Sequence, residues 1–464
     1  MNDTTTILSK MEDYIKQHCL NITQFGKLAG LNPGTMSAIL NGNRVMAVNQ
    51  LDRITAALAL PEGYFYEQYI QEHLNEASPN WRRIRPFLYR CAEMNKLECI
   101  RQILQLLMDN LLYSALLFET AEVFFQEAKK EAAIILFESV AAGERSQYSE
   151  RLAFCQYRLF NLKLGDDQTQ NLLIAHQFEP YVNRLDEIDQ LDALKDLANT
   201  YRSLRQWDKV NELAQEMGHK AQIQYNLEQR PTRKKSEEIK KTSRPLFVYI
   251  AYSNLLRAAV CDARKDFEQA LQFTSAYADL SWVRETDDET LHWKSLFQHW
   301  AQANTYVNRL MMGDISILSE YVEYIEGKKE IFSELLNIVE AANLYHIDVD
   351  HILNQFKDAV LSDEQQASAD IYTKQVIPEQ STRFWYELAK YYLNQGSYSD
   401  GFNYLLKSME KSAEINNKTV IINCVGLFER FKDFAVDEIQ LQYKNYIKKV
   451  WVKNDKGDFP VINR

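Results

Sequence analysis

The chain has 464 residues and a formal net charge of −11, so it is too long for one compact core and too acidic to coat nucleic acid along its whole length. Gly (14) and Pro (9) are scarce while 46% of residues are apolar, which favours long helices over sheets that need turn residues. No apolar run approaches the roughly 18 residues of a membrane span, and the N-terminus does not resemble a signal peptide. The six cysteines form no CxxC pair and are typical of reduced core residues, so we expect a cytoplasmic protein with no membrane association.

The first 71 residues carry five short apolar patterns at helical spacing. They cover 7–18, 22–29, 33–41, 49–59 and the residues after Pro61. Each pattern is two or three turns long, which predicts a small five-helix domain over 1–71. The segment 72–90 contains the break Ser78-Pro79-Asn80 and is expected to be a linker.

The region 91–451 is expected to be helical throughout and contains a repeat. Small and large residues alternate there as in a tetratricopeptide unit, in which small residues let two antiparallel helices approach. One match is Leu194, Leu197, Ala198, Tyr201, Val210, Ala214 and Met217. A second is Trp385, Leu388, Ala389, Tyr392, Gly401, Leu405 and Ser408. These matches predict an α-solenoid of degenerate helix pairs with a concave inner face; the alternative is a generic helical bundle.

Two segments differ from this pattern. The charged stretch 228–245, bounded near its ends by prolines, is expected to be an exposed loop or a frayed helix end, or alternatively a basic contact patch. The last residues, 452–464, are expected to be a C-terminal tail.

The stretch "NITQFGKLAGLNPGTMSAILNGNR" (21–44) contains the signals for two helices joined by a tight turn. Asn21 with a Gln three residues later forms a capping-box pattern. Gly30 can adopt the left-handed conformation that ends a helix, Asn32 can cap the next helix, and Pro33 suits its first position. Two short helices joined by a glycine turn in a small helical domain predict a helix-turn-helix.

"FGKLAGLNPGTMSAILNGNR" followed by "LDRITAALALPEGYFY" resembles the Cro/repressor-type helix-turn-helix of xenobiotic-response-element-type regulators. Followed by degenerate tetratricopeptide repeats, the chain resembles the RRNPP group of peptide-sensing regulators. That resemblance implies an N-terminal domain that binds double-stranded DNA and a repeat domain that binds a short signalling peptide. The scarcity of positive charge in the small domain further predicts a homodimer, with an interface supplied by the repeat region.

Under this resemblance the recognition helix is 33–41, and its usual base-facing positions hold Pro33, Gly34 and Ala38. None of the three can make a bidentate contact with a base. The remaining candidates for DNA contact are Lys27, Asn32, Thr35, Ser37, Asn41, Asn43 and Arg44. We expect modest affinity per domain, with dimerisation and DNA shape supplying much of the specificity.

For the peptide, the buried positions Leu194, Ala198 and Tyr201 orient the helix that contains them. This orientation predicts that a polar row faces the groove, where amides can bond to peptide backbone and cations to a carboxylate. The candidate peptide-binding residues are Asp192, Lys195, Asn199, Arg202, Asn254, Asn304, Asn308, Arg383, Tyr386 and Lys390.

The sequence contains no Gly-rich phosphate loop, GxSxG, HExxH or DxDxDG motif, and its histidines are dispersed. We therefore expect no enzymatic activity, no cofactor and no metal site. The leading hypothesis is a cytoplasmic transcriptional regulator controlled by a peptide. The alternative is a protein–protein adaptor that binds another protein, such as a response regulator, through its repeats.

Overall fold

The computed structural model describes residues 6–75, 79–107, 112–144, 149–229, 241–326, 331–357 and 371–457, without the side chains of 371–375 and 450–457. Within these ranges the chain is helical with short connections and contains no strand. The predicted all-α class is thereby confirmed. The chain divides into two compact units, residues 1–162 and 163–464, and each is described by itself.

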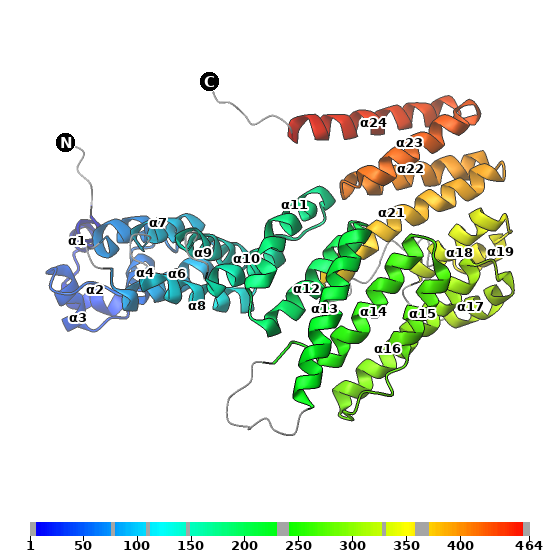
Figure 1. Ribbon diagram of the computed structural model, residues 1–464. Helices are drawn as coiled ribbons and strands as arrows, with labels where there is room; N and C mark the ends of the chain where they lie inside the picture. Colours follow the sequence, from blue (N-terminus) through cyan, green and yellow to red (C-terminus); the bar gives the residue numbers. More distant parts are fainter. Residues whose placement is uncertain are drawn as a thin grey trace. The chain divides into compact units, whose positions relative to one another are not determined.

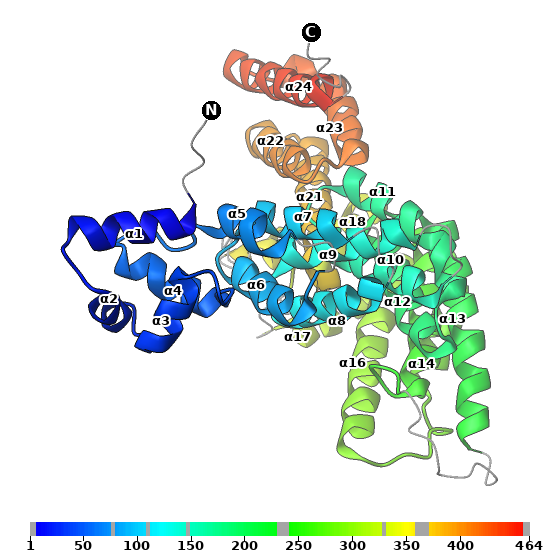
Figure 2. The same ribbon diagram turned by 90° about the vertical axis from the view of Figure 1, so that its left-hand side faces the viewer.

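The first unit contains the small helices and two later helix pairs. Its elements are α1 (Ile7–Gln17), α2 (Ile22–Leu28), α3 (Pro33–Leu40), α4 (Val48–Ala57), α5 (Tyr66–Tyr69), the π-helical turn η1 (Ile70–Leu74), α6 (Trp81–Glu93), α7 (Leu97–Leu107), α8 (Leu112–Gln126), α9 (Lys130–Gly143) and α10 (Glu150–Lys163). Figure 2 shows α2 and α3 beside each other.

The predicted linker 72–90 is wrong for most of its length, because residues 81–90 belong to α6. Asn80 caps this helix by accepting a hydrogen bond from Arg82 N. The ring of Phe87 packs 5.0 Å from that of Tyr66, and Arg90 Nε lies 2.9 Å from Asp52 Oδ2. The apolar face of α6 therefore completes the core of the small helices, and the break at residues 78–80 separates two helices of one unit.

The second unit is a succession of antiparallel helices (Figure 1). Its elements are α11 (Gln168–Phe178), the 3₁₀ turn η2 (Glu179–Arg184), α12 (Glu187–Ser203), α13 (Trp207–Glu228), α14 (Leu246–Ala263), α15 (Phe267–Ala278), α16 (Asp288–Met311), η3 (Ile315–Ile317), α17 (Leu318–Ile325), α18 (Phe332–Tyr345), α19 (Asp350–Gln355), α21 (Ile371–Asn394), α22 (Tyr398–Glu414), α23 (Lys418–Phe431), η4 (Lys432–Phe434) and α24 (Asp437–Gly457).

The helix pairs predicted from the repeat are present as α12–α13 and α21–α22. Every residue of the first match is buried, and so is every residue of the second except Tyr392, which is half-buried. Three-residue turns close the pairs, with a left-handed residue at the centre: Arg205 after α12, Lys265 after α14 and Gly396 after α21. The same turn conformation recurs because a left-handed residue redirects the chain directly after a helix end.

The two ends of the second unit meet. Helix α21 packs against α12 as well as against α22. Gln168 N donates to Ile415 O at 3.0 Å, and Asn416 Nδ2 donates to Thr169 Oγ1 at 3.2 Å, which joins the start of α11 to the turn between α22 and α23. The predicted concave inner face is therefore the inner side of a ring of helices around a central space.

The predicted C-terminal tail and the charged stretch 228–245 are described only in part. Helix α24 continues to Gly457, so the predicted tail begins later than residue 452, and 458–464 lie outside the described residues. In the charged stretch, α13 extends to Glu228, while 230–240 also lie outside the described residues.

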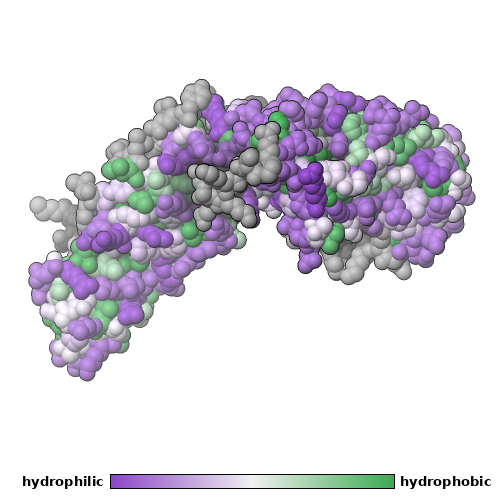
Figure 3. Space-filling view, turned by 60° about the horizontal axis from the view of Figure 1, so that its bottom comes forward, coloured by the Kyte–Doolittle hydropathy of each residue, from purple (hydrophilic) through white to green (hydrophobic). Residues whose placement is uncertain are grey.

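Helix α14 is the one helix within the described ranges with the length and mean hydropathy to cross a membrane. It packs between α13 and α15, and ten of its residues are buried, Leu246 and Val260 among them. The burial of α14 in the protein core explains its apolar composition. The face of the molecule in Figure 3 is mostly hydrophilic, with scattered apolar residues.

Substitution of Gly401 tests how closely α21 and α22 pack. A Cβ at this position lies 2.6 Å from Leu393 Cγ and 3.0 Å from the Leu393 backbone nitrogen. Gly401→Ala is expected to destabilise the protein by about 1–3 kcal/mol because the helices must separate, measured as a lower urea midpoint. Gly426→Ala on α23 is the control: no heavy atom lies within 4 Å of its Cβ, so stability should be unchanged or higher by up to about 1 kcal/mol. Equal effects of the two substitutions would contradict the packing.

Candidate functional sites

The turn between α2 and α3 has the predicted geometry. Gly30 has a φ of +63°, and Leu31 is buried in the core. Asn32 Oδ1 accepts a hydrogen bond from Gly34 N at 2.7 Å, which caps α3. A Cβ on Gly26 would lie 3.2 Å from Leu31 O, so the absence of a side chain there lets α2 approach the turn.

The candidate DNA-contacting residues lie at the end of α2, along α3 and in the turn after it. Lys27, Asn32, Asn41, Asn43 and Arg44 are exposed, whereas Thr35 and Ser37 are half-buried. Two of these side chains also form hydrogen bonds that stabilise α3. The Asn32 oxygen is engaged in the cap, and Asn41 Nδ2 donates to Ser37 Oγ at 3.3 Å.

The surroundings of α2 and α3 lack acidic groups even though the chain is acidic. Residues 14–51 contain no Asp or Glu but include Lys16, Lys27 and Arg44. The nearest acid along the sequence after this stretch, Asp52, accepts from Tyr66 Oη at 2.7 Å and pairs with Arg90. An anion that approaches the partly exposed α3 therefore meets no carboxylate from the helix or its flanking segments.

The predicted groove-facing row on α12 is wrong for its first three residues. Asp192 accepts from Tyr249 Oη at 2.6 Å, and Lys195 Nζ lies 3.2 Å from Asp196 Oδ1. Asn199 is 5% exposed, and its Oδ1 accepts from Tyr252 Oη at 2.6 Å. The reason is that α12 is packed by α13, α14 and α21, so its polar residues bridge helices instead of lining a groove.

Four of the ten candidate peptide-binding residues do meet in one pocket, namely Arg202, Asn304, Arg383 and Lys390. The others lie elsewhere. Asn254 is half-buried on α14 outside the pocket lining, Asn308 is fully buried, and Tyr386 packs against the core of α21 and α22.

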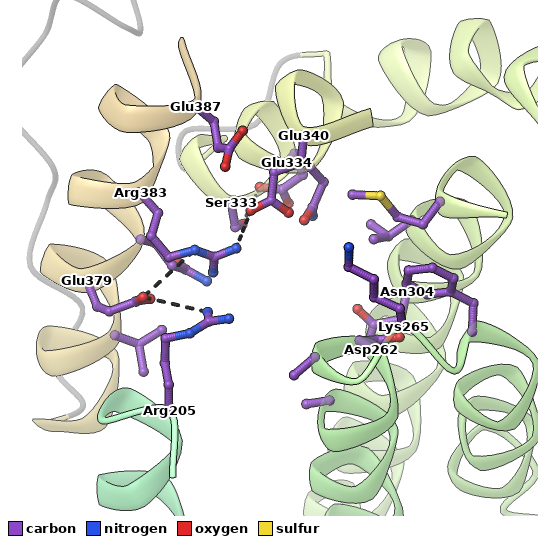
Figure 4. A pocket seen from close by; sticks show the side chains of 18 of the residues that line it. Arg205, Asp262, Lys265, Asn304, Ser333, Glu334, Glu340, Glu379, Arg383 and Glu387 are labelled. Atoms are coloured by element: carbon purple, nitrogen blue, oxygen red, sulfur yellow. Dashed lines mark hydrogen bonds and ion pairs between the residues drawn. The ribbon is translucent and has the colours of Figure 1, made fainter. Parts of the chain in front are cut away.

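The pocket has a volume of about 600 Å³ and lies between helices of the second unit. Figure 4 shows side chains that line it from close by. That volume is in the range of small-molecule and short-peptide sites. Its walls come from α12, α14, α16, α18 and α21, with the turns after α12 and α14. The charged and amide residues of the lining are Arg202, Arg205, Asp262, Lys265, Asn304, Glu334, Asn337, Glu340, Asn343, Glu379, Gln380, Arg383, Glu387 and Lys390.

Ion pairs join α18, α21 and the turn after α12 across one wall. Arg383 pairs with Glu340, and Lys390 Nζ lies 3.2 Å from Glu387 Oε2. Glu379 Oε1 lies 3.7 Å from Arg205 Nη1 and 3.9 Å from Arg383 Nε. Figure 4 shows Arg205 and Arg383 converging on Glu379 from different elements.

The opposite wall carries the equivalent turn of the next helix pair. Lys265 has the same left-handed position after α14 that Arg205 has after α12, and Asp262 is equivalent to Arg202. Burial raises the pKa of Asp262 to about 7, against the opposing effects of Arg202 and Asn308. The pocket therefore presents both signs of charge on both walls, with amides between them, and is suited to a dipolar ligand with backbone-like donors and acceptors.

Sequence reasoning missed the contribution of α18, whose residues Glu334, Asn337, Glu340 and Asn343 line the pocket. The signal was present as polar residues at every third position of an otherwise apolar helix, which places them on neighbouring turns. Among the described residues, no group of three or more His, Cys, Asp or Glu side chains is arranged to hold a metal ion.

No protein-family model matches the chain, and no curated protein matches it. The α2–α3 region and the pocket of the second unit are therefore the basis for assigning a function.

Asp262 provides a test of the pocket electrostatics. Its raised pKa means that the folded state binds its proton more tightly than the unfolded state, so stability falls as pH rises from about 4 to 7. Asp262→Asn should remove this penalty. We expect the variant to be more stable than the wild type at pH 8 by a few kcal/mol, at most about 4, with little difference at pH 4, in denaturant titrations. Asp13→Asn, at an exposed residue, is the control and should show no such trend; a pH-independent effect of Asp262→Asn would contradict the burial of a titrating carboxyl.

Proposed function

We propose that this chain is a cytoplasmic, non-enzymatic transcriptional regulator that binds double-stranded DNA through α2 and α3 and senses a short peptide in its central pocket. The observation that carries the DNA-binding role is the acid-free stretch 14–51 around the short, partly exposed helix α3 in a chain of net charge −11. Selective removal of acids from one exposed region is expected where phosphates approach.

The peptide-sensing role is supported by the pocket lining. Cations and carboxylates can bind the ends of a peptide. The Nδ2 groups of Asn304 and Asn343 donate to Tyr277 Oη and to Glu387, and their side-chain oxygens can accept hydrogen bonds from the peptide backbone. Because the pocket is bounded by helices from five successive parts of the second unit, a ligand contacts all of them at once. Binding can then shift the population between two arrangements of the ring, provided that it favours one of them.

We also propose that the protein acts as a homodimer. A domain with five Lys/Arg and six Asp/Glu in residues 1–70 has little net attraction for DNA. Two copies on paired half-sites double the number of phosphate contacts and impose a two-fold symmetric target.

A second candidate function is favoured by Pro33, Gly34 and Ala38, which lack hydrogen-bonding side chains at the usual base-facing positions. In that case the small helices serve as a docking module, and the protein is an adaptor that binds another protein. The two candidates differ in whether the full chain binds duplex DNA at all.

Lys27 and Arg44 test the DNA-binding role. Lys27→Ala and Arg44→Ala in the full chain should each weaken binding to all duplexes alike and reduce the slope of log affinity against log salt by about 0.9, the value for one lost phosphate contact. Fluorescence anisotropy with the DNA that flanks the gene and with a random duplex measures both quantities.

Lys10→Ala is the matched control, because Lys10 Nζ bonds to Tyr64 Oη at 2.9 Å and lies outside the acid-free stretch. It removes the same charge and should leave the salt slope unchanged. An equal loss from all three substitutions would mean that net charge alone matters, and absence of DNA binding by the wild type would favour the adaptor.

A further inference from the structure

Glu379 has an unusual environment for a buried carboxylate. It is 5% exposed, and its Oε1 has no hydrogen-bond partner. The two arginines nearest to it stand at 3.7 and 3.9 Å, beyond the range of a charge-assisted hydrogen bond. A buried charge is normally held by close hydrogen bonds, so Glu379 is paired more weakly than its burial requires.

The two arginines beside Glu379 differ in how completely they are paired. Arg383 is paired with Glu340 on α18. Within the described residues, Arg205 has one ion pair, the long one with Glu379, and its guanidinium lies 5.3 Å from the ring centre of Trp207. The side chain of Arg205 is 37% exposed and lines the pocket. Burial and the neighbouring Arg383 lower the pKa of Arg205, against the opposing effects of Glu379 and Glu340.

We propose that the pocket binds a ligand carboxylate between Arg205 and Arg383, and that Glu379 takes up one proton as the ligand binds. This inference rests on the proposed role of the pocket as a peptide site and adds the group that is recognised. The ligand enters as a carboxylate, a proton from solvent forms the O–H bond of Glu379, and no other bond forms or breaks. The protonated Glu379 can then donate a hydrogen bond to the incoming carboxylate.

The charged groups around Glu379 define the sign of the effect. Arg383 lies on its own helix, Arg205 and Arg202 come from α12 and its turn, and Glu340 comes from α18. Across the pocket lie Asp262 and Lys265. Burial raises the pKa of Glu379 and outweighs the opposing Arg383 and Arg205. A second carboxylate nearby raises the pKa further.

Proton uptake on binding means that affinity for a carboxylate increases as pH falls. The increase begins at the pKa of Glu379 in the complex and ends at its pKa in the free protein, with a slope of up to tenfold per pH unit for one proton. Glu379→Gln imitates the protonated side chain, so it should bind a carboxylate more tightly than the wild type at high pH. The difference should vanish at low pH.

The experiment uses three acetylated alanine-based pentapeptides as probes, titrated into the full chain by calorimetry from pH 5.5 to pH 8. The first ends in a free carboxylate, the second in an amide, and the third is the amide with a central Asp. The first probe tests a C-terminal carboxylate and the third a side-chain carboxylate. The variants are Glu379→Gln and, as the control at the other titrating carboxyl of the pocket, Asp262→Asn, each with its thermal unfolding measured to establish that it folds.

The proposal predicts that at least one carboxylate probe binds and that its affinity for the wild type increases as pH falls. Glu379→Gln should bind the same probe at least tenfold more tightly at pH 8 and lose most of the pH dependence. Asp262→Asn, on the other wall of the pocket, removes a second titrating carboxyl and should lose only the smaller part. Loss of the dependence in Asp262→Asn alone, unchanged or weaker binding by Glu379→Gln, or no binding of either carboxylate probe would overturn it. Equal binding of the amide without Asp would overturn the carboxylate site while leaving a peptide pocket, and thus the proposed function, intact.

Discussion

The return of α21 onto α12 is the contact on which the second unit depends. Successive helix pairs on their own form an open superhelix with free ends. Here α21 packs against α12, and the turn after α22 bonds to the start of α11, so the superhelix closes into a ring. Closure encloses a pocket of about 600 Å³ and brings Arg205 to within ion-pair distance of Glu379, 174 positions later in the sequence. The pocket exists because distant segments meet, and no single repeat contains it.

Closure also concentrates charge in a place that is poorly solvated. Moving ions from water costs several kcal/mol each unless partners with good geometry replace the water. Arg383 with Glu340, and Glu387 with Asn343 and Lys390, meet this requirement. Glu379, Arg205 and Asp262 meet it only in part, which is reflected in the raised pKa values of the two carboxyls. Incomplete pairing of this kind is typical of a binding site, where part of the stabilisation is left for a ligand to supply.

Local rules made much of the fold predictable. The Asn21 and Asn32 caps, the left-handed Gly30 and the small residues Ala198 and Gly401 depend on neighbours in sequence or on one partner helix, and each lies where its pattern indicated. Predictions failed where a third helix was involved. Asn199 was assigned to a groove because a single helix pair leaves it open, but α14 covers it. Residues 81–90 were assigned to a linker because the break at 78–80 was visible and the packing of Phe87 on Tyr66 was not. Helix α18 carries a visible row of polar residues, but the direction in which that row faces depends on ring closure, which has no local signal.

The proposed regulator requires α2 and α3 to bind DNA despite Pro33, Gly34 and Ala38 at the usual base-facing positions. With so little capacity for direct readout, specificity must come from the remaining polar residues of α3, such as Thr35, from DNA shape and from the spacing of two half-sites. The most direct test is a selection of duplexes from a random pool by the folded full-length protein, followed by sequencing of the bound fraction. The account predicts enrichment of a two-fold symmetric site with half-sites about one helical turn apart. A folded protein that enriches no motif and retains no duplex at low salt would contradict it.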